Sequence, residues 1–118
     1  MANDKTYNGW SNYETWAVKL WLDNEEGSYN YWRERSREIL LDPRSSDILT
    51  DEQTARYDLA DELKREHEEA TPEVSGVFAD LLNAALSEVD WSEIAESMLS
   101  DAKEQLVASD EWPEERDD

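Results

Sequence analysis

Four carboxylates with helical spacing are the side chains whose arrangement most directly suggests a chemistry. Asp58, Glu62, Glu66 and Glu69 follow one another at intervals of four, four and three residues. On an α-helix this spacing places them on one face, about 6 Å apart along the axis, comparable to the distance between successive phosphates of a nucleic-acid strand. A rigid row of carboxylates would compete for the Lys and Arg side chains that DNA-binding proteins direct at phosphates.

Further acidic residues extend this row into a candidate partner-binding surface that we name the acidic track: Asp51, Asp58, Asp61, Glu62, Glu66, Glu69 and Glu73. The track predicts a non-enzymatic acidic protein that binds a basic, DNA-handling protein. In its narrowest form the hypothesis is a DNA mimic that inhibits a host nucleic-acid-binding defence protein. Like charges four residues apart destabilise a helix by a few tenths of a kcal/mol per pair, so the row also has a cost.

Other arrangements of reactive side chains do not form a recognisable site. His67 is the only histidine and cysteine is absent, which excludes Cys/His zinc sites and paired E-x-x-H di-iron sites. Residues 23–34, DNEEGSYNYWRE, superficially suggest a calcium loop, but the glycine falls at position 5 instead of position 6. Three scattered glycines do not make a phosphate-binding loop. We therefore expect no catalytic residue, no metal and no cofactor, and interpret His67 as an ordinary residue at the core edge.

Acidic charge is concentrated in the second part of the chain. The net charge is −20, from 11 basic and 31 acidic side chains. Residues 1–41 hold five basic and seven acidic side chains, a net charge of −2, whereas residues 42–118 hold six and 24, a net charge of −18. Such a charge opposes direct binding to nucleic acid or anionic lipid, and it favours cationic partners or a very salty solvent. The alternative hypothesis is therefore a halophilic small protein of structural or regulatory role, whose acidity is a solvent adaptation.

The elements that must position these side chains are helices, because apolar residues recur at intervals of three and four. We expect an all-α, compact single-domain bundle of about five helices over residues 1–108, followed by a frayed, flexible acidic tail at residues 109–118. Capping signals place the helix starts after Ser11, Ser28, Thr50, Thr71 and Asp90. The fourth helix is the most hydrophobic and is expected at the centre of the bundle, with a face made by Val74, Val77, Phe78, Leu81, Leu82, Ala85 and Leu86.

Aromatic residues are dense at the start of the chain, with four tryptophans and four tyrosines in residues 7–32. Trp16, Trp21 and Trp32 fall on the expected inner stripes of the first two helices, so core packing accounts for them. Tyr7, Trp10 and Tyr31 do not, and we name them the aromatic lip. A binding module that is not a DNA mimic would use this lip as its partner-binding surface.

Location and self-association are also constrained by the composition. No apolar run approaches the roughly 18 residues of a membrane-spanning helix, and the opening lacks the features of a signal peptide. A cytoplasmic protein without membrane contact is expected. A homo-oligomer would form through residues 1–41, since the remainder of the chain repels itself.

Two segments resemble a known family. They are residues 7–29, YNGWSNYETWAVKLWLDNEEGSY, and residues 85–99, ALSEVDWSEIAESML. Their N-Y-E-T-W and D-W-x-E-I-A words are similar to those of short uncharacterised proteins from phages, plasmids and archaea. The resemblance implies a mobile-element context, in which small acidic proteins often act against host defence, but it implies no activity and no site residues.

Overall fold

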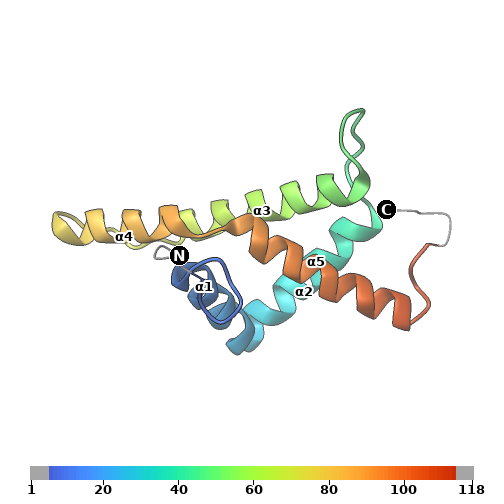
Figure 1. The fold of residues 1–118 in the computed structure, drawn as a ribbon, viewed down its shortest axis with the longest axis horizontal. Coiled ribbons are helices and arrows are strands. Elements are labelled where there is room, and N and C mark those ends of the chain that lie inside the picture. Colours follow the sequence, from blue (N-terminus) through green and yellow to red (C-terminus); the bar gives the residue numbers. More distant parts are fainter. Residues whose placement is uncertain (1–5, 114–118) are drawn as a thin grey trace.

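The computed structural model describes residues 6–113 and contains five helices (Figure 1). They are α1 (Tyr13–Asn24), α2 (Glu26–Leu41), α3 (Asp51–Glu69), α4 (Val77–Glu88) and α5 (Trp91–Ala108). Within the described residues, the only β-pairing is an isolated antiparallel bridge between Tyr7 and Trp10. The expected all-α class and the number of helices are confirmed.

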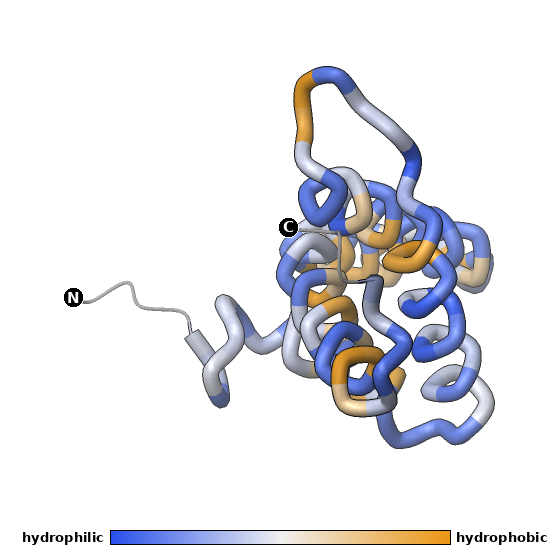
Figure 2. Tube along the Cα trace, turned by 90° about the vertical axis from the view of Figure 1, so that its right-hand side faces the viewer, coloured by the Kyte–Doolittle hydropathy of each residue, from blue (hydrophilic) through white to orange (hydrophobic). Residues whose placement is uncertain are grey.

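The core lies where α5 packs against both α2 and α3. Its fully buried side chains include Leu59 and Leu63 of α3, and Ile94 and Leu106 of α5. Figure 2 shows hydrophobic segments gathered among the packed helices, with a further one in the projecting loop between α2 and α3. Because burial of such residues drives folding, α2, α3 and α5 form the stable centre on which the other elements are arranged.

Local capping signals were right for two helices and wrong for the other three, of which α4 is described below. Thr50 and Gln53 form the expected reciprocal capping box at the start of α3, and the Asp90 side chain accepts from the Glu93 backbone N–H at the start of α5. The N-cap of α1 is Asn12 instead of Ser11, because Ser11 donates from its backbone N–H and its hydroxyl to the Glu93 carboxylate. In α2 the helix starts at Glu26, before the expected cap.

The start of α2 differs because a single residue, Glu25, separates it from α1. Gly27 therefore lies inside α2 and does not end α1. The hydroxyl of Ser28 donates to the backbone oxygens of Leu22 and Glu25 and holds the corner between the two helices. Tertiary contact replaces the expected side-chain cap.

The expected inner stripe of α1 is wrong. Trp21 is 74% exposed, and Tyr13 and Leu20 are exposed as well. The buried residues of α1 are Thr15 and Leu22. The reason is that α1 lies at the edge of the bundle, where the face turned inward is set by its contacts with α2, α4 and α5.

The expected position of α4 at the centre is also wrong. Thr71 does not start this helix, since its hydroxyl donates to the backbone oxygen of His67 and extends the end of α3. The helix starts at Val77, after Gly76, and none of its residues is buried. Figure 1 shows that residues 70–76 carry the chain outward beside α4, so that this helix projects from the body along its longest dimension.

Residues 109–113 follow α5 without helical structure. Trp112 packs against the core, and Lys103 Nζ lies 5.0 Å from the centre of its ring. Residues 114–118 of the expected acidic tail lie outside the described residues.

Candidate partner-binding surfaces

The acidic track lies along α3, and two of its carboxylates form ion pairs with arginines from other parts of the chain. Arg35 of α2 donates to Glu62 through Nε, at 2.8 Å, and through Nη2. Arg44, in the loop after α2, donates to Asp58 at 2.9 Å and 3.2 Å. These hydrogen bonds raise the pKa of both guanidinium groups. The two arginines therefore neutralise the middle of the track.

Two further members of the track also accept hydrogen bonds. Arg65 Nε lies 3.1 Å from Asp61 Oδ2, one turn earlier on the same helix. The Tyr31 hydroxyl donates to Glu66 Oε2 at 3.0 Å, and this hydrogen bond raises the pKa of the Tyr31 phenol. Asp51 lies in the first turn of α3. Glu69 is the last residue of α3, Glu73 follows it in the next segment, and both are exposed. The exposed carboxylates of the track therefore collect at its C-terminal end.

The aromatic lip is divided between two places. Tyr7 and Trp10 exchange backbone hydrogen bonds of 2.8 Å in both directions across a tight turn in which Asn8 and Gly9 have positive φ. The Tyr7 ring contacts Tyr13 and Trp16, with ring centres 5.1 Å and 4.7 Å away. Trp10 is half-buried against the core.

Tyr31 belongs to a different environment. Its ring meets Trp32 edge-on at 4.9 Å, and its hydroxyl binds Glu66. Tyr31 is thus a contact between α2 and α3, whereas Tyr7 belongs to an aromatic cluster on α1.

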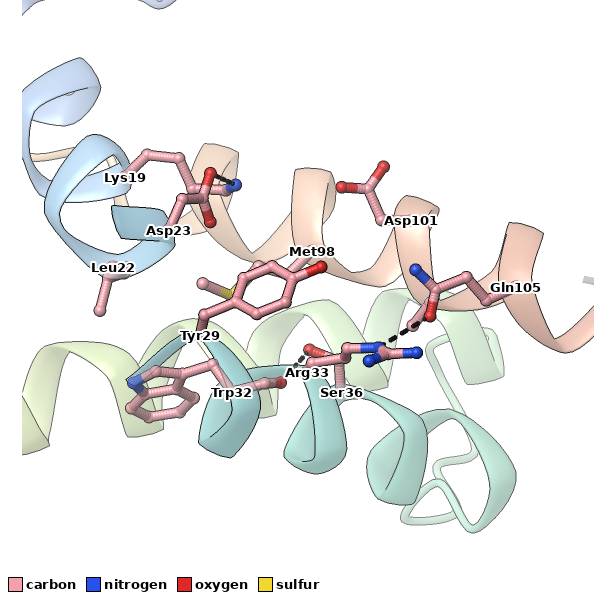
Figure 3. A pocket seen from close by; sticks show the side chains of 11 residues that line it. Lys19, Leu22, Asp23, Tyr29, Trp32, Arg33, Ser36, Met98, Asp101 and Gln105 are labelled. Atoms are coloured by element: carbon pink, nitrogen blue, oxygen red, sulfur yellow. Dashed lines mark hydrogen bonds and ion pairs between the residues drawn. The ribbon is translucent and has the colours of Figure 1, made fainter. Parts of the chain in front are cut away.

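A small cavity lies among α1, α2 and α5 (Figure 3). Its volume is about 60 Å³. Lys19 donates to Asp23 at 2.6 Å, and Arg33 donates to Gln105 at 3.0 Å, so both cations that line the cavity already have a hydrogen-bond partner. A small-molecule site usually needs at least about 300 Å³. The cavity is therefore too small to hold a typical ligand.

His67 has a structural role at the edge of the core. Its Nδ1 lies 2.7 Å from the Leu63 backbone oxygen, and its ring packs on Trp91 with centres 5.0 Å apart. Within residues 6–113, no group of three His, Asp or Glu side chains converges in a way that could hold a metal ion.

A long acidic segment without any lysine or arginine was not recognised from the sequence motifs. Residues 66–102 contain ten acidic side chains and no lysine or arginine. Seven of the nine lysines and arginines in residues 6–113 lie within 4 Å of a carboxylate, the exceptions being Arg33 and Lys64. The gap between Arg65 and Lys103 was the signal that could have revealed this region.

The same region carries an exposed apolar surface, which we name the α4 face: Val77, Phe78 and Leu81. Their side chains are 62%, 67% and 62% exposed. Val74, just before the helix, is exposed beside them in sequence. The hydrophobic pattern of α4 was predicted correctly, but it was interpreted as a core stripe when much of it faces solvent.

Comparisons with known proteins give a family without an activity. A family model described as a family of unknown function (DUF7249) matches residues 3–111. No curated protein and no solved structure is detectably similar to the chain. In the described part of the chain, every helix is too short or too polar to cross a membrane.

Proposed function

This chain belongs to the DUF7249 family of unknown function, and we propose that it is a non-enzymatic acidic protein that binds a basic partner. One observation supports this most strongly: the chain uses most of its cations in internal ion pairs, while residues 66–102 contain ten carboxylates and no lysine or arginine, and among the described residues only Glu96 of these ten lies within 4 Å of a cation, Arg56. Such a surface attracts cationic proteins over long distances and repels nucleic acid and anionic membranes.

A narrower form of the proposal is DNA mimicry in the cytoplasm, directed at a host DNA-handling or defence protein. The alignment of the acidic track along α3 supports it, as does the resemblance to proteins of phages and plasmids. However, Asp58, Asp61, Glu62 and Glu66 already accept hydrogen bonds within the chain. The geometry therefore favours a basic partner at the C-terminal end of α3 over a row of phosphate-like charges along the whole helix.

The proposal is tested by titrating the full chain with a fluorescent deca-arginine peptide and following its anisotropy from 0.05 to 0.5 M NaCl. One variant neutralises four carboxylates within residues 66–102: Glu69→Gln, Glu73→Gln, Asp80→Asn and Glu88→Gln. The matched control removes the same charge elsewhere: Glu26→Gln, Asp42→Asn, Asp47→Asn and Glu104→Gln. With a few tenths of a kcal/mol per exposed pair, the first variant should bind about tenfold more weakly, and the control should change much less.

Equal losses in both variants would mean that only net charge matters, and no binding at 0.05 M NaCl would contradict the proposal. Mimicry makes an additional demand, because the chain should then displace duplex DNA from a basic DNA-binding domain. A complex in which duplex and chain bind together would remove the mimicry form and keep the broader one.

The halophilic alternative is favoured by a different observation. Glu26 and Glu104, on α2 and α5, have no cation within ion-pair distance among the described residues, so unpaired carboxylates also occur outside residues 66–102. A solvent adaptation requires a chain that unfolds as NaCl falls below molar concentration and refolds when salt returns. Far-UV circular dichroism from 0.05 to 3 M NaCl decides this, since a binding protein of a low-salt host stays folded throughout.

A further inference from the structure

The apolar sector of α4 is wider than the surface that covers it. At about 100° per residue, Val77, Leu81 and Phe78 occupy one sector, and the half-buried Leu82 and Leu86 occupy the next. Among the five helices, α4 lies against α1 alone. The contact with α1 accounts for the second sector and leaves the α4 face open.

An open face of this kind is costly in an isolated helix. An isolated helix of 12 residues is only marginally stable in water unless one of its faces is packed. The helix α4 has 12 residues, and none of them is buried. Solvent-exposed apolar patches with polar surroundings commonly mark interaction sites. Figure 1 shows α4 at the end of the elongated molecule, where the body does not obstruct the approach of another chain.

The charges around the α4 face indicate what kind of chain this is. Asp80 borders the face on the side away from α1, Glu88 lies in the same angular sector about two turns after Leu81, at the C-terminal end of α4, and Glu73 precedes the helix. No lysine or arginine occurs between Arg65 and Lys103. A second copy would bring the same carboxylates to its own α4 face, so like charges oppose self-association there. A partner with apolar and cationic side chains satisfies both requirements.

We propose that the α4 face is the docking site for a basic amphipathic helix of another protein. Its apolar side chains pack on Val77, Phe78 and Leu81, and its Lys or Arg side chains reach Asp80 beside the face and Glu88 at the C-terminal end of α4. An amphipathic helix laid on an apolar surface is a common mode of recognition, and large aromatic anchors contribute most of its affinity. This inference rests on the proposed function and assigns it a surface and a partner chemistry.

The test uses two labelled synthetic peptides with the same number and spacing of lysines. One carries leucines at positions i, i+3, i+4 and i+7, and the other has glutamine at those positions. The full chain should bind the leucine peptide at least about tenfold more tightly, as expected for a buried anchor. Phe78→Ala should remove this preference for the leucine peptide. Val107→Ala, which changes an exposed apolar residue of α5 instead of α4, should leave the preference unchanged.

The variants also separate the possible failures. Circular dichroism verifies the fold of Phe78→Ala, and Asp80→Asn with Glu88→Gln tests the neighbouring carboxylates without altering the apolar face. Equal affinity for the two peptides would overturn the docking site and leave the basic-partner proposal standing. Failure to bind either peptide would overturn both. A dimer in sedimentation that Phe78→Ala dissociates would overturn the inference by assigning the α4 face to a second copy.

Discussion

Two fully buried threonines differ in what their hydroxyl groups contact. Thr15 Oγ1, in α1, accepts a hydrogen bond of 2.8 Å from the Asp90 backbone N–H at the start of α5. Thr54 Oγ1, in α3, is buried without a hydrogen-bond partner. An unsatisfied buried hydroxyl is destabilising, while a paired one joins two helix ends.

We predict that valine has opposite effects at these two positions. Thr15→Val leaves the Asp90 N–H without its acceptor and should lower the free energy of unfolding by about 1–3 kcal/mol. Thr54→Val removes an unpaired polar atom at constant shape and should raise it by about 1 kcal/mol. Urea denaturation measures both, and each variant is the control for the other. A loss of stability in Thr54→Val would contradict the assignment of its hydroxyl as unsatisfied.

Glu111 carries a pH-dependent contact between α2 and the segment after α5. The Ser109 hydroxyl donates to it at 2.7 Å and Arg37 at 3.1 Å, and both lower the pKa of the Glu111 carboxyl from its ordinary 4.5. Since the folded pKa is depressed, the contact is fully present above the unfolded pKa and is lost as the pH falls through the folded pKa.

We predict that acidification below about pH 4.5 releases the segment that holds Trp112. The Trp112 indole N–H resonance should shift in an NMR titration over that range. Glu111→Gln should show the released position at neutral pH, and Asp110→Asn, a neighbouring exposed carboxylate, should titrate like the wild type. An unchanged Trp112 signal in Glu111→Gln would show that the carboxylate does not hold the segment.

At the scale of elements, α4 is the least supported helix, and its start depends on one glycine. Gly76 has φ 65° and ψ −140°, a conformation that side chains other than glycine rarely adopt. Gly27 lies inside α2, with open space around its Cα and without positive φ. The backbone at position 76 therefore requires glycine, whereas the helical backbone at position 27 accepts a larger residue.

Gly76→Ala should strain the backbone by about 1–3 kcal/mol and loosen α4, while Gly27→Ala should stabilise the chain by up to about 1 kcal/mol. Hydrogen exchange should show faster α4 amide exchange in Gly76→Ala, with α3 and α5 unchanged, because α4 contributes no buried residue to the core. Uniform acceleration in all helices would show that α4 is coupled to global unfolding.

At the scale of the whole molecule, a net charge of −20 acts against the compact state and the ion pairs act for it. Repulsion extends over a Debye length of about 10 Å or more at low salt, whereas exposed ion pairs contribute little. We predict that raising NaCl from 0.05 to 0.5 M increases the urea midpoint of unfolding. A decrease would mean that screening of ion pairs such as Arg35–Glu62 outweighs the relief of repulsion.

Features that depend on residues close together in the chain could be predicted from the sequence. The helix starts after Thr50 and Asp90 were predicted correctly, because a capping signal is complete within a few residues. The expected burial of Trp32 was also correct, and the acidic row was placed on α3.

Which of these surfaces are free depends on contacts between distant parts of the chain and could not be predicted from the sequence. The residues that donate to carboxylates of the acidic track from elsewhere in the chain, Arg44, Arg35 and Tyr31, lie 14, 27 and 35 positions from their partners, and no local pattern encodes such contacts. The position of α4 also depends on features without a local pattern: where α3 ends, and the path that residues 70–76 take from α3 to α4. Periodicity shows that a helix has an apolar face, but burial depends on the neighbour that covers it, and no other helix within residues 6–113 covers the α4 face.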